Sequence, residues 1–149
     1  MQAGEPAWIA FVDFPTHISA MAACGVGPDT QVVAYDNEGS IFASRLWWML
    51  RWVGHEKVAV LDGGVPCWRR AKREFQTEVP SYPPAPFVVR SGIAPYGTDD
   101  VLERLDDPQF LILDARAPER FSGEEENLDP VGGHIPGAIN RFYFDNLDD

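Results

Sequence analysis

The fold is decided by residues 31–64, which read QVVAYDNEGSIFASRLWWMLRWVGHEKVAVLDGG. The run opens on QVVAY and closes on KVAVL, two short apolar segments rich in β-branched residues that predict buried strands. Between them, residues 40–53 carry apolar side chains at helical spacing, with Ser40 placed to cap the helix and Gly54 to end it. Strand, helix and strand in this order predict a parallel sheet covered by helices, with a right-handed crossover.

The same alternation extends on both sides of this unit. Upstream, residues 14–24 have the helical spacing of apolar side chains. Downstream, Pro66 stands where a helix can begin, and a basic helix is predicted over residues 67–75. Prolines then crowd residues 76–95, which disfavours helix, and a short strand over residues 87–90 is the element that we expect in that stretch.

The last third of the chain is predicted to continue the α/β pattern. Its elements are a helix over residues 99–105 capped by Thr98, a buried strand over residues 109–114 (QFLILD), a polar loop over residues 115–133, and a turn with a short strand near Ala138 and Ile139. Counted along the whole chain, two strands are therefore expected from the first half and up to three from the second.

Charge is spread unevenly over the 149 residues, which carry a formal net charge of -11. Residues 1–75 hold seven Lys/Arg and eight Asp/Glu, a net of -1, whereas residues 76–149 hold five and fifteen, a net of -10. Such acidity offers no electrostatic footprint for nucleic acid or an anionic membrane. No apolar window reaches ~18 residues and no basic segment precedes an apolar run near Met1, so we expect neither a membrane span nor a signal peptide.

The two cysteines, Cys24 and Cys67, are too few for a disulfide framework. Neither cysteine stands at metal-binding spacing from another ligand, and the histidines are isolated from one another. We therefore expect no metal, no cofactor and a reducing, cytoplasmic setting.

Six segments together carry a family resemblance, and they span nearly all of residues 13–149. They are residues 32–36 (VVAYD), 43–48 (ASRLWW), 60–68 (VLDGGVPCW), 113–116 (LDAR), 119–123 (ERFSG) and 133–138 (GHIPGA). Each motif is weak alone, but in this order and spacing they resemble the rhodanese family of sulfurtransferases. The resemblance implies an α/β fold with a parallel sheet flanked by helices.

The order of the motifs implies a particular arrangement of domains. In a single rhodanese domain the Asp-x-Arg strand and the GHIPGA turn precede the nucleophile loop and the LDGG strand, whereas in this chain they follow them. Tandem-domain thiosulfate and 3-mercaptopyruvate sulfurtransferases would give this order. The resemblance then implies that residues 1–79 are the C-terminal part of an inactive domain, residues 80–97 a Pro-rich linker, and residues 98–149 the N-terminal part of a second domain that lacks its catalytic-cysteine loop.

The family reaction passes a sulfane sulfur from thiosulfate or 3-mercaptopyruvate to a cysteine, and then to cyanide or a thiol. Asp36 stands where an active domain has that cysteine. Since a carboxylate cannot form a persulfide, the chain alone is expected to be inactive. Asp36 would either hydrogen-bond near a partner domain or cap the helix that follows.

Arg120 resembles the arginine that binds the anionic donor in the active domain of the family. A guanidinium suits thiosulfate or a carboxylate because it offers a rigid fork of N–H donors. The alternative is a surface arginine paired with Glu119 or Glu124.

Four further residues have weaker claims to a role. In the family, the positions of Asp114 and Arg116 mostly tie the loop to the sheet, and His134 is expected to hydrogen-bond its turn. Cys67, in the first turn of a basic helix, is weighed as a substitute nucleophile but follows the wrong strand for the family loop. Cys24 is expected to be buried and inert.

Two questions stay open at the level of sequence. A non-catalytic rhodanese-like module that binds a protein or an anion competes with the enzyme, and a phosphatase is a distant third because no Cys-x5-Arg loop is present. The two half-sheets could close as one permuted domain, be exchanged in a homodimer, or associate with a missing portion of the protein.

Overall fold

A computed structural model describes residues 14–93 and 95–147 of the chain. The chain divides into two compact units, Met1–Ala94 and Pro95–Asp149. Residues 1–13, which belong to the predicted first domain, lie outside the described residues. None of the described helices is both long and apolar enough to cross a membrane.

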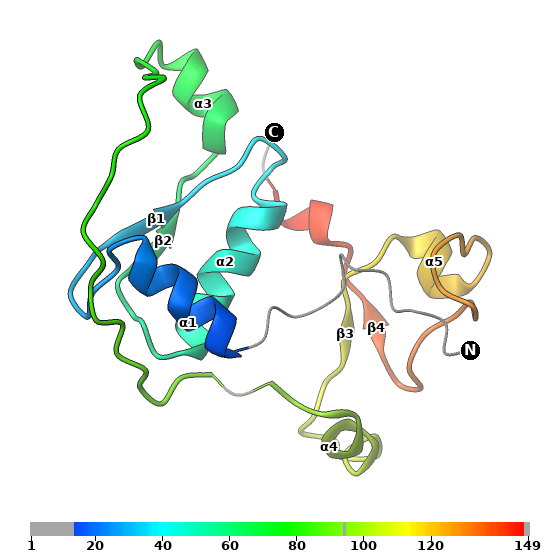
Figure 1. Cartoon of the computed structure of the whole chain (residues 1–149). Helices are drawn as coiled ribbons and strands as arrows, with labels where there is room; N and C mark the ends of the chain where they lie inside the picture. The colour runs from blue at the N-terminus through cyan, green and yellow to red at the C-terminus, as the bar shows by residue number, and fades with distance from the viewer. Residues whose placement is uncertain (1–13, 94, 148–149) are drawn as a thin grey trace, which may run out of the picture. The chain divides into compact units, whose positions relative to one another are not determined.

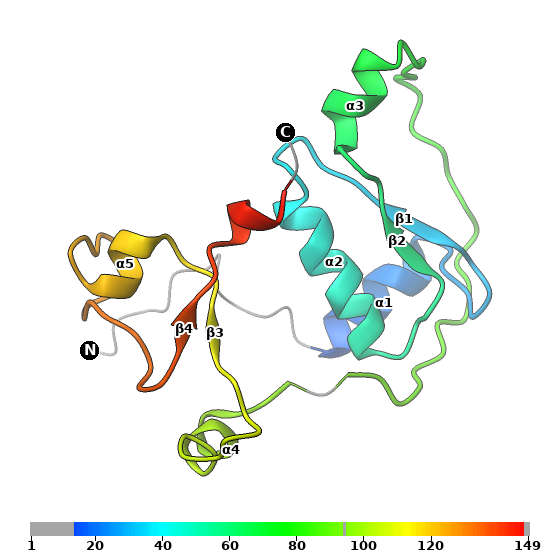
Figure 2. The same ribbon diagram turned by 180° about the vertical axis from the view of Figure 1, so that it is seen from behind.

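The first unit is built on the predicted strand–helix–strand run. β1 (Val32–Ala34) and β2 (Val58–Val60) pair in parallel, and α2 (Ile41–Trp52) connects them and lies against both strands (Figures 1 and 2). Leu50 and Val53, on and just after α2, are fully buried. The predicted parallel unit is thus confirmed, with α2 covering one face of the sheet.

Glycine ends α1 (Phe14–Ala23), as expected from the sequence. Gly25 has a φ of +79°, and its N–H donates to the carbonyl of Ala22 at 3.1 Å while that of Val26 donates to Met21 at 3.0 Å. These bonds satisfy carbonyls that the helix end would otherwise leave without donors. The predicted helix is therefore correct to within one residue.

The basic helix begins earlier than predicted. α3 spans Gly64–Arg70, because Gly63 and Gly64 both take a positive φ and turn the chain directly out of β2 into the helix. A Cβ at Gly64 would lie 2.5 Å from the carbonyl oxygen of Asp36, so only glycine allows this close approach. The N–H of Val65 donates to that same oxygen at 3.0 Å, which ties the start of α3 to the loop after β1.

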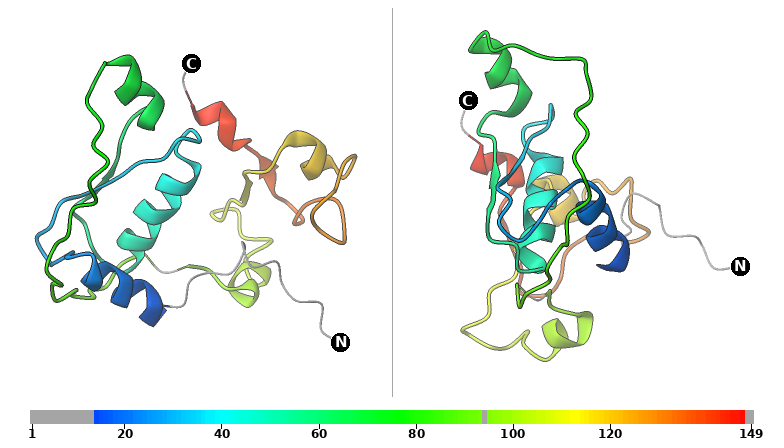
Figure 3. Two further views of the ribbon diagram at one scale, coloured as in Figure 1. Left: turned by 45° about the horizontal axis from the view of Figure 1, so that its top comes forward. Right: turned by 60° about the vertical axis from the view of Figure 1, so that its left-hand side comes forward.

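The stretch after α3 runs back along the first unit without regular secondary structure (Figure 3). The strand expected over residues 87–90 is absent, and single hydrogen bonds replace it: Ala85 donates to Ala22 at 3.0 Å and Arg90 to Val53 at 3.0 Å. The neighbouring prolines have no N–H to donate, so a continuous ladder cannot form there.

The second unit has a smaller parallel pair at its centre. β3 (Leu113–Asp114) pairs with β4 (Ile139–Asn140), and these are the ends of the strands predicted there. Around them lie α4 (Thr98–Leu102), α5 (Pro118–Ser122) and the 3-10 helix η1 (Tyr143–Asn146). The described strands thus form two two-stranded parallel sheets, one in each unit.

Two local expectations for the second unit were wrong. The polar loop contains α5, whose five residues are too few to show a helical period. Thr98 is the first residue of α4 rather than its cap, because the N–H of Gly97 donates to the Asp100 carboxylate at 2.8 Å. The Asp100 carboxylate thus makes the bond of a capping box that runs from the N-cap N–H to the side chain three residues on, while glycine at the N-cap offers no side chain for the reciprocal bond.

Candidate functional site

The loop between β1 and α2 closes around the carboxylate of Asp36. Four backbone N–H groups donate to it: Glu38 and Ser40 to Oδ1 at 2.9 and 2.8 Å, and Phe42 and Ala43 to Oδ2, both at 2.9 Å. Two of these donors belong to the first turn of α2, whose amides have no partner within the helix. The loop is therefore a cradle for one anion, and Asp36 occupies it.

The backbone of this loop is turned inward by two successive residues with positive φ, Gly39 at +66° and Ser40 at +72°. Successive N–H groups in such a conformation point to one centre and attract negative charge. The prediction that the Ser40 side chain caps α2 was wrong, since Ser40 makes no side-chain cap bond. Asp36 already accepts the amides that a capping hydroxyl would take.

The electrostatics of the loop favour the ionised form of Asp36. Partial burial alone would raise the pKa of this carboxyl, but hydrogen bonds from the N–H groups of Ala43, Glu38, Ser40 and Phe42 outweigh that effect. The net result is a pKa below the ordinary value of 3.8. At neutral pH the cradle therefore holds a full negative charge.

In the second unit, Asp114 and Arg116 form a fork at the end of β3. The guanidinium Nη2 and Nε of Arg116 lie 2.6 and 3.0 Å from Oδ2 of Asp114, and Nη2 also donates to the carbonyl of Gly133 at 2.6 Å. The side-chain amide of Asn140, on β4, donates to the carbonyls of Asp114 and Arg116. This pair therefore ties the loop after β3 to both the sheet and the turn near Gly133.

Arg120, on α5, is held by two carboxylates that the sequence did not single out. Its Nε and Nη2 donate to Glu126 at 3.0–3.2 Å, and Nη2 donates to Asp129 at 2.7 Å. The alternative prediction, that Arg120 pairs with Glu119 or Glu124, was wrong. Glu119 precedes Arg120 directly on the helix and so faces another way, whereas the loop after α5 folds back and brings Glu126 and Asp129 to the guanidinium.

Glu126 is firmly held within the loop that follows α5. Its side chain is 7% exposed, and its Oε1 accepts the backbone N–H groups of Leu128 and Asp129, both at 2.9 Å. Hydrogen bonds from Asp129 and Leu128, followed by that from Arg120, lower the pKa of Glu126 from 4.5 to about 2. Nη1 of Arg116 lies 3.5 Å from the same carboxylate.

His134 joins the GHIPGA turn to α5. Its Nδ1 lies 2.7 Å from the carbonyl oxygen of Phe121, and the two rings stack with centroids 3.8 Å apart. A shallow hollow of about 560 Å³ beside this turn is lined by Asp114, Arg116, Asp129 and His134 among others. Asp114, Arg116 and His134 therefore line one hollow, and Arg120 is linked to it through its hydrogen bond to Asp129.

The two cysteines occupy different environments. Cys67 lies in α3, partly exposed, with Nη2 of Arg70 at 2.9 Å from its Sγ. Cys24 is exposed, so the expectation that it is buried was wrong. It directly follows Ala23, the last residue of α1. Both thiols are free.

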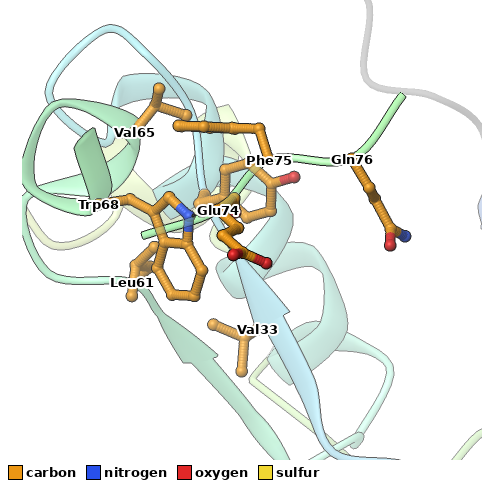
Figure 4. A pocket seen from close by; sticks show the side chains of 8 residues that line it. Val33, Leu61, Val65, Trp68, Glu74, Phe75 and Gln76 are labelled. Atoms are coloured by element: carbon orange, nitrogen blue, oxygen red, sulfur yellow. Dashed lines mark hydrogen bonds between the residues drawn. The ribbon is translucent and has the colours of Figure 1, made fainter. Parts of the chain in front are cut away.

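An apolar hollow of about 540 Å³ lies on the first unit, beside the end of the two-stranded sheet. Val33 lies on β1 and Leu61 directly follows β2, and the rings of Trp68 and Phe75 also line the hollow (Figure 4). Side chains alternate between the faces of a strand, so exposed Val33 and buried Ala34 point to opposite faces. This face of a parallel sheet, which normally lies buried, is open in the described part of the chain.

Sequence reasoning missed three residues of the second cluster: Glu126, Asp129 and Asn140. The available signal was the run of acidic residues after α5. The carboxylates in this run repel one another, and a nearby cation would offset that repulsion. Which acid meets Arg120 depends on a turn in the loop, and at Gly123 that turn needs a φ of +83°. Residue types alone do not specify such a turn.

The fold and the loop define a class of α/β domains in which a parallel strand leads into an anion cradle at a helix N-terminus. The sequence model of the rhodanese-like domain matches residues 6–71 and 97–149. This chain belongs to the rhodanese-like family, as its motifs predicted.

Relatives in this family include sulfurtransferases for both donors. The chain is 39% identical over 130 residues to the thiosulfate sulfurtransferase of Mus musculus, covering 83% of this chain and 43% of that protein. It is 38% identical over 130 residues to the 3-mercaptopyruvate sulfurtransferase of Homo sapiens, with the same two shares. The solved 3-mercaptopyruvate sulfotransferase SseA from Escherichia coli aligns at 33% identity and a TM-score of 0.77, over 90% of this chain and 51% of that one. The chain thus spans about half the length of the curated relatives that it matches.

Proposed function

We propose that this chain is part of a sulfurtransferase that moves a sulfane sulfur from thiosulfate or 3-mercaptopyruvate to cyanide or a thiol. In the thiosulfate half-reaction, a cysteine thiolate attacks the outer sulfur, the S–S bond of thiosulfate breaks, and sulfite leaves with its electron pair. The persulfide so formed then gives its outer sulfur to the acceptor. The names of the relatives support both donors.

The observation that carries the rest of the proposal is the carboxylate in the loop cradle. The four N–H groups that converge on Asp36 would suit a thiolate or persulfide equally well, because each is an anion. A carboxylate holds the charge but has no sulfur to exchange. We therefore propose that the chain alone is inactive, and that Asp36 maintains the loop in a non-catalytic domain.

We propose the corresponding division of the chain into domains. Residues 1–79 are the C-terminal part of the inactive domain, residues 80–97 a Pro-rich linker, and residues 98–149 the N-terminal part of the second domain, without its cysteine loop. The span of about half the relatives' length supports this division. The free thiols of Cys24 and Cys67 also favour a reducing, cytoplasmic setting.

In the second domain we propose Arg120 as the residue that binds the anionic donor, with Asp114, Arg116 and His134 supporting it. The supporting residues fix the loop that carries Arg120: Arg116 ties it to Gly133 at 2.6 Å, and His134 meets the carbonyl of Phe121 next to Arg120. No step of the reaction passes through these three side chains.

We extend the proposal to the open apolar face of β1 and β2. Val33, Tyr35, Trp68 and Phe75 are between 41% and 62% exposed, although such side chains favour burial. We propose that a missing portion of the domain covers this face in the complete protein. A homodimer that exchanges halves is the competing occupant, and the mass of the chain in solution distinguishes them, since only the exchange doubles it.

A non-catalytic binding module is the second candidate function. The same fixed carboxylate favours it, because a loop filled by its own side chain cannot accept a donor. Stable, monomeric folding of this chain without activity would support the module.

The proposal is tested by thiocyanate formation from cyanide, with thiosulfate and then 3-mercaptopyruvate as donor. The chain and its Cys67→Ser variant should both be inactive, because neither has a nucleophile in the cradle. Activity that disappears in Cys67→Ser would contradict the proposal, since the thiol in α3 would then be the nucleophile. Activity retained in Cys67→Ser would contradict it as well, and would direct attention to Cys24.

A further inference from the structure

Arg120 presents its N–H groups on two edges, and different carboxylates take them. A planar guanidinium offers one pair of donors along its side, from Nε and Nη2, and another pair across its end, from Nη2 and Nη1. Glu126 takes the side pair, with distances of 3.0–3.2 Å. Asp129 takes the remaining hydrogen of Nη2 at 2.7 Å. Within the described residues Nη1 has no acceptor, so the end of the fork is half filled.

The two carboxylates differ in how firmly they are held. Glu126 is 7% exposed and accepts two backbone N–H groups as well as Arg120. Asp129 is 47% exposed, and within the described residues its carboxylate contacts only Arg120 at 2.7 Å and Arg116 at 4.0 Å. The backbone of Asp129 is anchored separately, by its N–H bond to Glu126. Its side chain can therefore swing away while the loop stays in place.

The charge of the cluster opposes an incoming anion as long as Asp129 stays. Two arginines, Arg116 and Arg120, face three carboxylates, which are Asp114, Glu126 and Asp129, so one negative charge is in excess. Displacement of the Asp129 side chain removes that excess from the end of the fork. It also frees both end hydrogens for two oxygens of one ligand.

We propose that Asp129 is an internal competitor for the anionic sulfur donor at Arg120, and that donor binding displaces its carboxylate. Glu126 is then a positioning residue that holds the guanidinium in place while the donor replaces the Asp129 carboxylate. The inference rests on the proposed role of Arg120 in donor binding. It adds a residue that sets donor affinity, and the ligand class is an anion that presents two adjacent oxygens, such as thiosulfate.

The experiment measures thiosulfate binding to the whole chain by NMR titration of backbone and arginine side-chain N–H signals at constant ionic strength. Asp129→Asn should bind about five- to tenfold more tightly than the unmodified chain, because one nearby negative charge is removed and an amide oxygen competes less strongly than a carboxylate for Nη2 of Arg120. Asp106→Asn is the matched control, since it removes the same charge from an exposed position in the same unit. Arg120→Ala and the double variant Arg120→Ala/Asp129→Asn complete the set.

The outcomes distinguish a failure of the proposed competition by Asp129 from a failure of the proposed donor site at Arg120. A gain in Asp129→Asn that Asp106→Asn lacks, and that disappears in the double variant, supports the competitor. Binding that requires Arg120 but is equal in Asp129→Asn and Asp106→Asn overturns the competitor and leaves the donor site standing. Binding that survives Arg120→Ala, or no binding by any variant, overturns both. If Asp129→Asn loses the amide pattern of the fold, Asp129→Ala replaces it and is judged by the same comparison.

Discussion

Two aspartates in this chain are held as anions by opposite means. Asp36 is surrounded by four backbone N–H groups, which belong to the loop itself and cannot leave. Asp129 is held by the side chain of Arg120, and it is 47% exposed. The first arrangement builds a carboxylate into the fold, whereas the second leaves a cation that another anion can reach. We infer that the loop around Asp36 cannot exchange its carboxylate for a ligand, whereas an anionic ligand can replace Asp129 at Arg120.

The units that carry these two sites differ in the same sense. The first has an apolar core in which Leu50 and Val53 are fully buried. Among the described residues of the second unit, only Ala138 is a buried apolar side chain. Its loops are ordered instead by ion pairs and hydrogen bonds around Arg116 and Arg120. Such contacts orient a site well but contribute little net stability.

The largest effect is expected from Asp36→Ala. The substitution leaves four N–H groups without their acceptor, and loss of a helix cap together with loop hydrogen bonds costs about 2 kcal/mol of unfolding free energy. Urea unfolding followed by tryptophan fluorescence reports on this unit, because all five tryptophans lie within residues 1–75.

Asp62→Ala provides the control for the loss of charge. Asp62 is an exposed carboxylate of the first unit, in the turn just after β2, and its removal should leave the unfolding midpoint nearly unchanged. Equal midpoints for Asp36→Ala and Asp62→Ala would mean that the cradle does not stabilise the fold.

A smaller effect, confined to acid, is expected at Glu126. Its pKa is lowered from 4.5 to about 2 in the folded chain, so its stabilising contribution is complete above 4.5 and is lost as the pH falls toward 2. The carboxyl carbon of Glu126, followed by NMR, should titrate near pH 2. In Arg120→Gln the pKa should rise but stay below 4.5, because the N–H groups of Asp129 and Leu128 remain and are the largest causes of its shift.

Titration of Glu126 near its ordinary value in the unmodified chain would show that the loop does not hold this carboxylate. Arg120 would then have lost its anchor, and the distinction between a fixed and a displaceable carboxylate would fail.

The sequence predicted the first unit better than the second, and the reason is physical. QVVAY, KVAVL and the helix between them have apolar patterns long enough to specify the elements, and β1, α2 and β2 lie where they were expected. The predicted burial of the two strands was wrong for the face that carries Val33, which is 50% exposed. In the second unit the ordering contacts are ion pairs across a loop, and residue spacing does not determine them. Glu126 and Asp129 were therefore missed, although Arg120 itself was identified.

The loop around Asp36 was predicted in outline but not in its chemistry. Asp36 was identified by its place in the family pattern, and helix capping was one of its two predicted roles. The capping is confirmed by the bonds from Phe42 and Ala43. Ser40 was wrongly given the cap, because its positive φ follows from the turn as a whole and not from serine.

We propose that the loop after β1 is an anion cradle in which a carboxylate occupies the nucleophile position. Asp36→Cys tests this proposal, because it places a thiol in the cradle. The variant is made in a Cys24→Ser/Cys67→Ser background, so that the introduced thiol is the only one. The rate of alkylation by iodoacetamide as a function of pH gives its pKa, and Ser81→Cys in the same background supplies an exposed thiol for comparison. We expect a pKa at least about one unit below the ordinary ~8.5, because the four N–H groups would stabilise the thiolate. A pKa equal to that of Ser81→Cys, or above it, would contradict the claim.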